Sequence, residues 1–584
     1  MNDYVISGGT IFDGSGAEGF TGDVGIKDGL ISEVSTTGNL SGTEVIDATG
    51  AIVAPAWVDI HTHYDGQVTW DEEMNPSASH GVGTVVMGNC GVGFAPVAAG
   101  AEKDLIDLME GVEDIPGTAL YEGMPWGSWE SYPEYLDYLA TRKYAINISS
   151  MIAHGAVRNY VMGTRGRDNE AATGADLAQM GRIVEEALRA GAVGFSTSRI
   201  LGHRSTHGEP VPGTFANDTE VMVIAQALKR AGKGLFQIIP SSTLGPGADE
   251  AQEHTSLEQE LDLIANVSRE SGRPSTFTLF QIDDWSNKWR EAIAQVKAAN
   301  ESGAQVYPQV GSRPTGLVFS MQTYHPWLLK PTYLKLRALP IEKRLVELRK
   351  PAIKKALLSE ENNIDGVLVG TMEYGIAHIE PDFEYAFELR RNSTYEPQKN
   401  ESFARRAAAT DRSPESAMYD YLVEEPARMA ILFFTNYSDF NLDAVREMQL
   451  DDSTVTGLSD AGAHVSLIFD AVNPTYQLTY WARDRTQGKT LPLAHVIHRA
   501  THKNAQLFGF TDRGLIKPGM TADLNVINYD KLQLEDLGLV QDLPAGGVRL
   551  MQGATGYIAT LINGVLTRRF DKDTGMRPGR LVRS

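Results

Sequence analysis

The chain has 584 residues, 42% of them hydrophobic and 22% charged, and this composition is typical of a globular protein. Its length exceeds the usual size of a single hydrophobic core. Its net charge of −23 argues against nucleic acid or an anionic membrane as the main partner. No stretch approaches the roughly 18 apolar residues that span a bilayer, and the N-terminus lacks the basic and apolar regions of a signal peptide. We therefore expect a cytoplasmic protein.

Short strands are predicted near both ends of the chain. The pair Asp28-Gly29 is typical of a hairpin turn between two strands. Strand-like patterns of this kind occur in residues 4–6, 24–31, 522–527 and 556–565. Because such strands cannot bury both faces alone, we expect residues 1–55 and 510–584 to form one small β domain.

The region between them, residues 56–509, alternates apolar strands with amphipathic helices such as 178–190 and 217–231. Eight strands are expected, at residues 57–61, 83–89, 146–152, 192–198, 234–239, 276–282, 304–310 and 454–459. Eight strands separated by helices fit a (β/α)8 barrel, which places the chain in the α/β class.

Two stretches of this region are too long for a single barrel helix, and we expect them to be insertions. The first covers about residues 97–145, and its segment 105–111 is placed to cap the mouth of the barrel. The second covers about residues 311–453 and is expected to be helical around 342–358 and 414–432.

Three side chains with metal-binding chemistry follow the first two expected barrel strands. His61 and His63 end the first strand, and because residues two apart on a strand point the same way, both imidazoles face one point at its C-terminal end. Cys90 ends the second strand. As the single cysteine it cannot form an internal disulfide, so it is a small core residue, a reactive thiol or a metal ligand. The alternative for the histidine pair alone is an exposed position on the surface.

The motifs around these residues resemble a known family. Residues 53–63 are similar to the first-strand motif of the amidohydrolase superfamily of metal-dependent hydrolases, and residues 512–524 to its return into a β-sandwich. Residues 88–91, Gly-Asn-Cys-Gly, resemble the second-strand motif of the N-acyl-D-amino-acid deacylases, or D-aminoacylases, in which the cysteine replaces a carboxylated lysine as metal ligand. The resemblance continues in residues 154–158 and 194–198, and implies a TIM-like barrel with a β-sandwich.

The resemblance also implies a catalytic aspartate, Asp460, after the eighth strand. We expect one divalent metal held by His61, His63 and Asp460, with Cys90 as a further ligand or bridge; mixed nitrogen, sulfur and oxygen ligands favour zinc, with iron and manganese as alternatives. Asp460 would take a proton from the metal-activated water and return it to the leaving nitrogen. On the residues alone, Asp460 also suits a helix N-cap, and His464 a packing position.

The chain departs from the deacylases at three places. They carry one histidine after strand five and another after strand six, whereas residues 234–240 and 280–285 contain none. Asp283 or Asp284 is a candidate oxygen ligand or, alternatively, a helix cap. The arginine-containing motif that follows the catalytic aspartate in the family is also missing, so the handedness of the substrate stays open.

Several polar residues near the expected barrel mouth are candidates for substrate binding. Tyr307 stands at a position where the family has a tyrosine that touches the substrate, and either His154 or His464 is expected to stabilise the oxyanion. Arg204 and His207 belong to a polar cluster after strand four that either grips an acidic or amide-bearing substrate or is a solvated loop. The predicted substrate-binding residues are His154, Arg199, His203, Tyr307 and His464.

Together these features predict a metal-dependent amidohydrolase. The expected reaction is hydrolysis of an amide C–N bond other than a peptide bond, in an N-acyl amino acid or a related small amide. One alternative is an ester, lactone or carbamate as substrate for the same groups; another is a non-catalytic interaction protein that kept the fold. The expected partners are a small-molecule substrate and, by analogy with the superfamily, further copies of the chain.

Overall fold

The computed structural model describes residues 1–243, 256–282, 286–390 and 393–584, so Asp283 and Asp284 lie outside the described residues. Each of the eight expected barrel strands is present, several of them shorter than expected. They are β6 (Trp57–Asp59), β7 (Val82–Met87), β8 (Asn147–Ser150) continued by β9 (Ile152–Ala153), β10 (Gly194–Ser198), β11 (Leu235–Ile239), β12 (Ser275–Thr278), β13 (Val306–Val310) and β17 (Val455–Thr456). The predicted barrel is therefore confirmed.

All neighbouring pairs of these strands are parallel, in two sheets of order β6-β7-β8 and β9-β10-β11-β12-β13-β17. The sheets join at Met151, which lies between β8 and β9 and donates its backbone N–H to the carbonyl of Met87. On the other side Thr62, beyond β6, bridges Ala461, beyond β17, in parallel register. The sheet therefore closes on itself.

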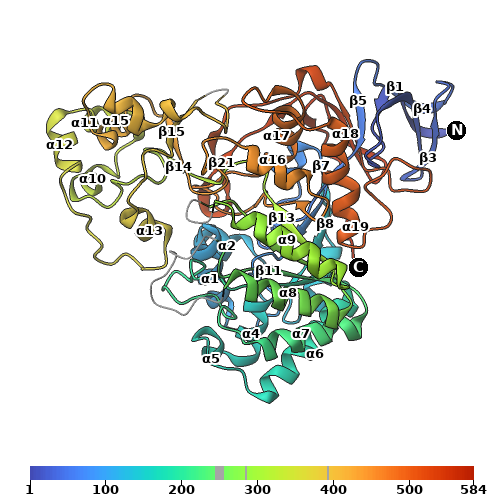
Figure 1. Ribbon diagram of the computed structural model, residues 1–584, viewed down its shortest axis with the longest axis horizontal. Helices are drawn as coiled ribbons and strands as arrows, with labels where there is room; N and C mark the ends of the chain where they lie inside the picture. Colours follow the sequence, from blue (N-terminus) through green and yellow to red (C-terminus); the bar gives the residue numbers. More distant parts are fainter. Residues whose placement is uncertain (244–255, 283–285, 391–392) are drawn as a thin grey trace.

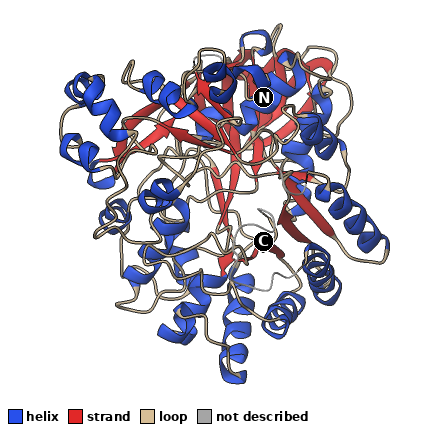
Figure 2. Cartoon of the chain, turned by 60° about the vertical axis from the view of Figure 1, so that its left-hand side comes forward, coloured by secondary structure: helices blue, strands red, loops and turns tan. Residues whose placement is uncertain are grey.

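Helices follow the strands and cover the outside of the barrel (Figure 2). They include α4 (His154–Met162), α5 (Thr164–Arg167), α6 (Gly174–Ala190), α7 (Asp218–Ala231), α8 (Leu257–Ser271), α9 (Lys288–Glu301), α16 (Asp443–Leu450), α17 (Asn473–Tyr476), α18 (Leu493–His498) and α19 (Asn504–Leu507). In α7 the side chain of Asn217 caps the first turn by accepting from the Glu220 N–H, while Val221, Ile224 and Leu228 are buried. The expected helices 178–190 and 217–231 are thus observed.

Strands from both ends of the chain share one sheet, of order β25-β24-β23-β18-β5-β1-β2-β3 with β4 beside β1. At its centre β5 runs antiparallel to β18, with Val53 opposite Val526. The expected hairpin is present, and Asp28 and Gly29 adopt the positive φ angles, 53° and 81°, that its tight turn requires. These strands are β1 (Asn2–Ile11), β2 (Phe20–Lys27), β3 (Leu30–Ser35), β4 (Gly42–Asp47), β5 (Ile52–Pro55), β18 (Leu524–Ile527), β23 (Tyr557–Ile562), β24 (Val565–Arg569) and β25 (Lys572–Asp573).

Residues 97–145 form three helices: α1 (Glu102–Glu113), α2 (Gly117–Gly123) and α3 (Tyr132–Ala140). Four short strands, two of them a hairpin, lie between β18 and β23: β19 (Gln533–Leu534), β20 (Gly538–Leu543), β21 (Gly547–Met551) and β22 (Ala554–Thr555). Helix α1 contains the segment 105–111, whose residues Leu105, Leu108 and Met109 are buried. Its last residue, Glu113, reaches the C-terminal end of the barrel.

Residues 311–442 build a lobe with its own hydrophobic core, at the opposite side of the molecule from the N-terminal strands (Figure 1). A three-stranded antiparallel sheet, β14-β16-β15, lies beside six short α-helices in the described residues of this lobe. These elements are β14 (Gly316–Phe319), α10 (Pro331–Leu336), α11 (Ile341–Leu348), α12 (Pro351–Leu357), α13 (Met372–His378), β15 (Ala386–Leu389), α14 (Phe403–Ala408), α15 (Pro414–Leu422) and β16 (Met429–Phe433).

The helix expected over residues 414–432 is partly wrong. Helix α15 ends at Leu422, and Met429–Phe433 is β16, the central and fully buried strand of the small sheet. Pro426 lies between them, where it cannot continue the helical hydrogen bonding. Among the described residues, no helix combines the length and the apolar character that crossing a membrane requires.

A buried polar network ties the sheet of the chain ends to the barrel. The Asp523 carboxylate accepts from Arg513, from the side chain of Asn147 on β8 and from the backbone N–H of Asn563. Arg513 also donates to Thr84 on β7. Because Asp523 and Arg513 are both buried, their charges are compensated by these contacts rather than by water.

We predict that Asp523→Ala lowers the free energy of unfolding by about 2 kcal/mol, because the side chain of Asn147 and the N–H of Asn563 lose their acceptor. Arg513 keeps its ion pair with Asp512, so its charge stays compensated. Urea unfolding followed by tryptophan fluorescence measures the change. The control is Asp530→Ala, at an exposed position, whose free energy of unfolding is expected to stay close to that of the wild type. Equal stabilities of the two variants would contradict the role given to this network.

Candidate metal centre

His61, His63 and Cys90 meet at the C-terminal end of the barrel. The two histidines follow β6 and the cysteine follows β7, which is adjacent and parallel. The Cys90 Sγ lies 3.3 Å from His61 Nε2 and 3.7 Å from His63 Nε2, and all three side chains are buried. Their ligand atoms form a group that can hold a metal ion.

Asp460 lies beside this group, on the other side of the barrel seam. Its Oδ1 lies 3.4 Å from His61 Nε2 and 3.8 Å from His63 Nε2, and its side chain is 22% exposed. The backbone N–H of Asp460 donates to the His61 carbonyl, and that of His63 to the Ala461 carbonyl. The closure of the barrel therefore brings the aspartate to the histidine pair.

The spacing of His61, His63 and Cys90 fits a divalent cation, and Asp460 Oδ1 lies beside the two imidazoles. With the usual zinc bond lengths, a tetrahedral site separates nitrogen and oxygen donors by about 3.3 Å, and nitrogen and sulfur donors by about 3.6 Å. The distances of 3.3 to 3.8 Å found here match this arrangement. Nitrogen, sulfur and oxygen donors in one set are also the mixture that zinc accepts.

Two further side chains orient the imidazole rings. His61 Nδ1 lies 2.8 Å from Gln309 Oε1, on β13, and His63 Nδ1 lies 3.2 Å from Glu113 Oε1, at the end of α1. When Nδ1 carries the proton, it donates to Gln309 at His61 and faces the Glu113 carboxylate at His63, and the Nε2 lone pairs face the group centre. Gln237, on β11, accepts from the backbone N–H of Cys90. Both glutamine side chains are buried.

The backbone is strained at two of the residues that carry the donors and at His464 beside them. Cys90, Asp460 and His464 have φ angles of 57°, 47° and 49°, in the left-handed region that side chains other than glycine rarely adopt. Each such conformation costs on the order of 1–3 kcal/mol and is maintained only by the surrounding structure. Strain of this kind is concentrated at functional sites, which agrees with the position of the cluster.

Burial sets the protonation of the group. It lowers the pKa of His61 to about 4 and that of His63 well below its usual value, so both imidazoles are neutral and able to bind a cation at neutral pH. Burial and the nearby carboxylates raise the pKa of the Cys90 thiol. Burial, together with the charge of Asp460, raises the pKa of Glu113 in the same way.

His464 and His203, two of the predicted substrate-binding residues, lie beside the cluster. His464 Nε2 is 3.6 Å from Glu113 Oε2, and its side chain is 19% exposed. His203 is half-buried, and its Nδ1 lies 3.1 Å from Ser198 Oγ. Burial, together with the nearby His464 and His61, lowers the pKa of His203 to about 3, so this imidazole is also neutral.

His154 and Arg199 are instead bound into buried networks. The ring nitrogens of His154 lie 2.8 Å from Thr197 Oγ1 and 2.8 Å from Glu220 Oε1. Arg199 donates to the buried Glu260 and to a backbone carbonyl. Both side chains already have protein partners, so the structure does not bring them to the metal cluster.

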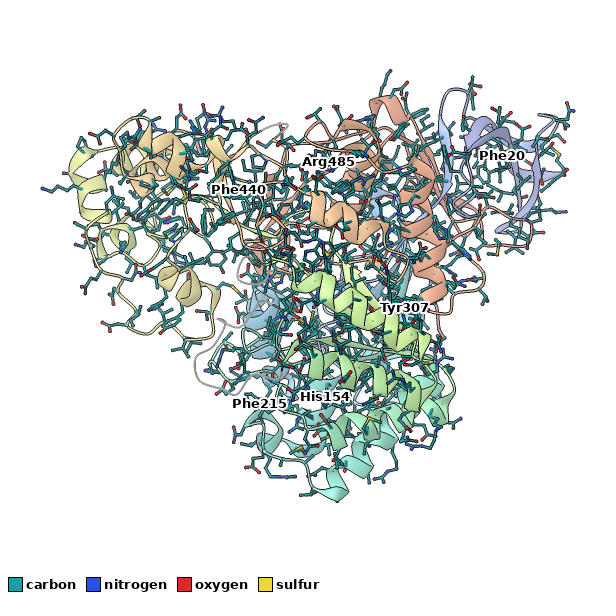
Figure 3. The ribbon with its side chains drawn as sticks, in the orientation of Figure 1. Phe20, His154, Phe215, Tyr307, Phe440 and Arg485 are labelled. Atoms are coloured by element: carbon teal, nitrogen blue, oxygen red, sulfur yellow. The ribbon has the colours of Figure 1, made fainter. Side chains whose placement is uncertain are left out.

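Tyr307 also lies apart from the cluster, on the inward face of β13 but two residues before Gln309. It packs with Val58, Leu235 and Val455 in a separate hydrophobic core near the N-terminal ends of the strands. Figure 3 shows Tyr307 and His154 at separate places in the molecule. Of the other residues of the predicted polar cluster, His207 contacts Asp107 and Arg204 donates to the Gly208 carbonyl.

Three residues of the site were missed by sequence reasoning: Glu113, Gln237 and Gln309. The sequence could have indicated the two glutamines, because each is the single amide side chain in an otherwise apolar or aromatic barrel strand. Nothing in the sequence indicated Glu113, because it lies at the end of an amphipathic helix, where an acidic residue is usually exposed to solvent.

Comparisons with known proteins agree with this geometry. The sequence model of the amidohydrolase family matches residues 44–567. An N-acyl-D-aspartate deacylase of Alcaligenes xylosoxydans xylosoxydans is 33% identical over 231 residues, which is 39% of this chain and 42% of that protein. A D-aminoacylase of the same organism is 34% identical over 230 residues, 39% of this chain and 43% of that protein. The chain thus spans about two fifths of the length of these curated relatives.

Solved structures match the chain over its whole length. A D-aminoacylase variant in complex with copper chloride has a TM-score of 0.65 at 22% identity, and both chains are covered completely. An N-acyl-D-glutamate deacylase from Bordetella bronchiseptica, complexed with zinc and a phosphonate inhibitor, has a TM-score of 0.63 at 22% identity and equal coverage. These matches confirm the fold, and the match to the family model confirms the resemblance inferred from the motifs.

The contacts of His154 predict a structural role that can be measured through Glu220. Although burial alone would raise it, the hydrogen bonds and charges of His154 and Arg158 lower the pKa of Glu220 to about 2. A carboxylate with a lowered pKa in the folded state stabilises the protein above its unfolded pKa, about 4.3, and this contribution is lost as the pH falls toward 2. We therefore predict that Glu220→Gln lowers the unfolding free energy at pH 7 by about 3 kcal/mol.

The difference between wild type and Glu220→Gln is expected to shrink between pH 5 and pH 2, in urea titrations at a series of pH values. Glu186→Gln, on the neighbouring helix α6, serves as the control. Zinc affinity is expected to stay unchanged in both variants, and a loss of affinity in Glu220→Gln would place His154 in the metal centre.

Proposed function

The chain belongs to the amidohydrolase family, and from this premise we propose that it hydrolyses an amide C–N bond outside peptides, in an N-acyl amino acid or a related small amide. The observation that carries the proposal is the convergence of His61, His63, Cys90 and Asp460 at the C-terminal end of the barrel. Relatives described as an N-acyl-D-aspartate deacylase and a D-aminoacylase support the choice of an N-acyl amino acid.

The proposed cofactor is one divalent cation, with zinc preferred, held by these four side chains. A solved D-aminoacylase is described as having a binuclear metal centre with one-metal activation and second-metal attenuation. In this chain β11 and β12, the fifth and sixth strands, have the sequences Leu-Phe-Gln-Ile-Ile and Ser-Thr-Phe-Thr, without histidine. This difference favours a single cation.

A bound divalent cation supplies Lewis acidity, which makes water a better nucleophile and polarises the substrate carbonyl. Asp460 is proposed as the general base and acid. Its Oδ1 faces the histidine pair, which leaves Oδ2 for proton transfer, and its partial exposure puts the carboxylate where substrate enters. Asp460 would accept the proton of the attacking water and deliver it to the leaving nitrogen.

His464 is proposed to donate a hydrogen bond to the carbonyl oxygen as negative charge develops on it. Burial lowers the pKa of His464 to about 4, so at neutral pH the ring is neutral and carries one N–H. His154 was the alternative for this role, but its ring nitrogens lie at Thr197 and Glu220. His203, the other neutral imidazole beside the cluster, is proposed to contact the substrate.

The second candidate substrate is a lactone, ester or carbamate without a free carboxylate. It is favoured by the contacts of Arg199, whose guanidinium is paired with Glu260 and is therefore not free to bind an acidic substrate. The same cation and Asp460 would act on such a carbonyl. A cytoplasmic location and assembly into homo-oligomers remain predictions from the sequence.

We predict that the purified protein contains about one zinc per chain, measured by plasma emission spectrometry after dialysis. In Cys90→Ala the zinc affinity is expected to fall at least about 10-fold, because a donor is lost from the set. Ser271→Ala, which removes a buried hydroxyl at the end of α8, is the control and should retain wild-type affinity. Absence of stoichiometric metal in the wild type would favour a non-catalytic protein.

We predict that Asp460→Asn retains zinc and loses at least about 100-fold in kcat, because an amide can bind the metal but cannot accept the proton. Asp452→Asn, at an exposed position just before β17, is the matched control. Turnover is measured first on N-acyl amino acids of both hands and then on esters, lactones, carbamates and larger amides. Hydrolysis of lactones alone would replace the amide proposal with the second candidate.

A further inference from the structure

Glu113 is the one acidic residue of α1 that is buried, and it lies against the metal centre. The helix also carries Glu102, Asp104, Asp107 and Glu110, and none of these four is buried. The side chain of Glu113 is 2% exposed, with Oε1 3.2 Å from His63 Nδ1 and Oε2 3.6 Å from His464 Nε2. One carboxylate therefore faces two histidines that follow the first and the eighth barrel strands.

The backbone holds this carboxylate in place. The N–H of His464 donates to the carbonyl of Glu113, and the next residue, Asp114, has a φ angle of 53°. Asp114 in turn accepts from the Tyr324 hydroxyl at 2.8 Å and from the Ser466 N–H at 3.2 Å. The end of α1 is thus fixed between the loop after β17 and the lobe that begins with β14.

The negative charge of a buried carboxylate is usually balanced by a lysine or arginine side chain, but the described contacts of Glu113 are of another kind. Within the described part of the chain, the ion pairs of Glu113 are with histidines rather than with lysine or arginine. An uncompensated buried carboxylate costs several kcal/mol, so it persists only beside a proton or a positive charge. A cation held by His63 and its neighbours would provide that charge a few ångströms away.

From this geometry we propose that Glu113 is a positioning residue of the metal centre, supplied by an inserted helix rather than by a barrel strand. Its carboxylate lies 3.2 Å from His63 Nδ1, where its charge favours the tautomer that keeps the proton on Nδ1 and leaves Nε2 free for the cation, and it also lies beside His464 at the opening. The inference rests on the metal-binding part of the proposed function and deepens it.

His61 and His63 would then differ as ligands. His61 is oriented by the neutral amide of Gln309, whereas His63 is oriented by a carboxylate. A carboxylate acceptor makes the imidazole more basic than an amide does, so His63 would be the stronger of the two donors. Loss of the Glu113 charge should therefore weaken metal binding even when the shape of the side chain is kept.

The test compares Glu113→Ala and Glu113→Gln with wild type and with Glu110→Gln, a half-buried position one turn earlier on α1. Each metal-free protein is titrated with Zn²⁺ against a chromogenic chelator. We expect the affinity to fall about 10- to 100-fold in Glu113→Ala and by an intermediate factor in Glu113→Gln, and to remain at the wild-type value in Glu110→Gln. Glu113→Gln has the shape of the native side chain, so it carries the test even where Glu113→Ala fails to fold.

Absorption of the Co²⁺-substituted proteins separates positioning from general stability. We expect the thiolate-to-cobalt band from Cys90 to remain in Glu113→Gln, while the d–d bands change because the His63 ring has moved. Unchanged affinity and unchanged d–d bands would overturn the proposal. A drop from two metals to one would also overturn it, because Glu113 would then be a ligand. A wild-type protein without stoichiometric metal would remove the proposed function as well.

Discussion

Pairing between the first and the eighth strand is the interaction on which the site depends. Strands β6 and β17 are only three and two residues long, so the segments just beyond them close the barrel. The backbone of His61 accepts from Asp460, and the backbone of His63 donates to Ala461. These bonds fix the register between the strands, and the register places the Asp460 carboxylate beside both imidazoles. A shift of one residue would turn these side chains to the other face.

Sequence reasoning located the barrel strands because a parallel strand buried on both faces is a continuous apolar run. It could not assign side chains to a level along the barrel axis. Tyr307 and Gln309 illustrate this: they share a face of β13, but Gln309 contacts His61 while Tyr307 packs near the opposite ends of the strands. The alternation of a strand gives the face, and only the closed barrel gives the level.

Partners from distant segments were equally hidden in the sequence. His154 follows its strand as expected, but its role is set by Glu220, which lies on a helix 66 residues later. Glu113 belongs to an inserted helix whose direction depends on the packing of Leu105, Leu108 and Met109. No local pattern encodes such a direction, so motif spacing found the candidate ligands His61, His63 and Cys90 and missed Glu113, which lies beside His63.

The charge of the site links its chemistry to the stability of the fold. Glu113 and Asp460 are acids close to one another, and burial and neighbouring carboxylates raise the pKa of both. The histidines around them are neutral, so within the site the charged forms of these acids lack the positive partner that a bound cation would supply. A dication would bind only the closed barrel, because the proposed donors come from three separate strands and meet only there. The free energy of cation binding would offset the cost of the strained backbone at Cys90 and Asp460. The same buried arrangement of donors and acids that destabilises the fold without a cation would therefore favour the binding of one.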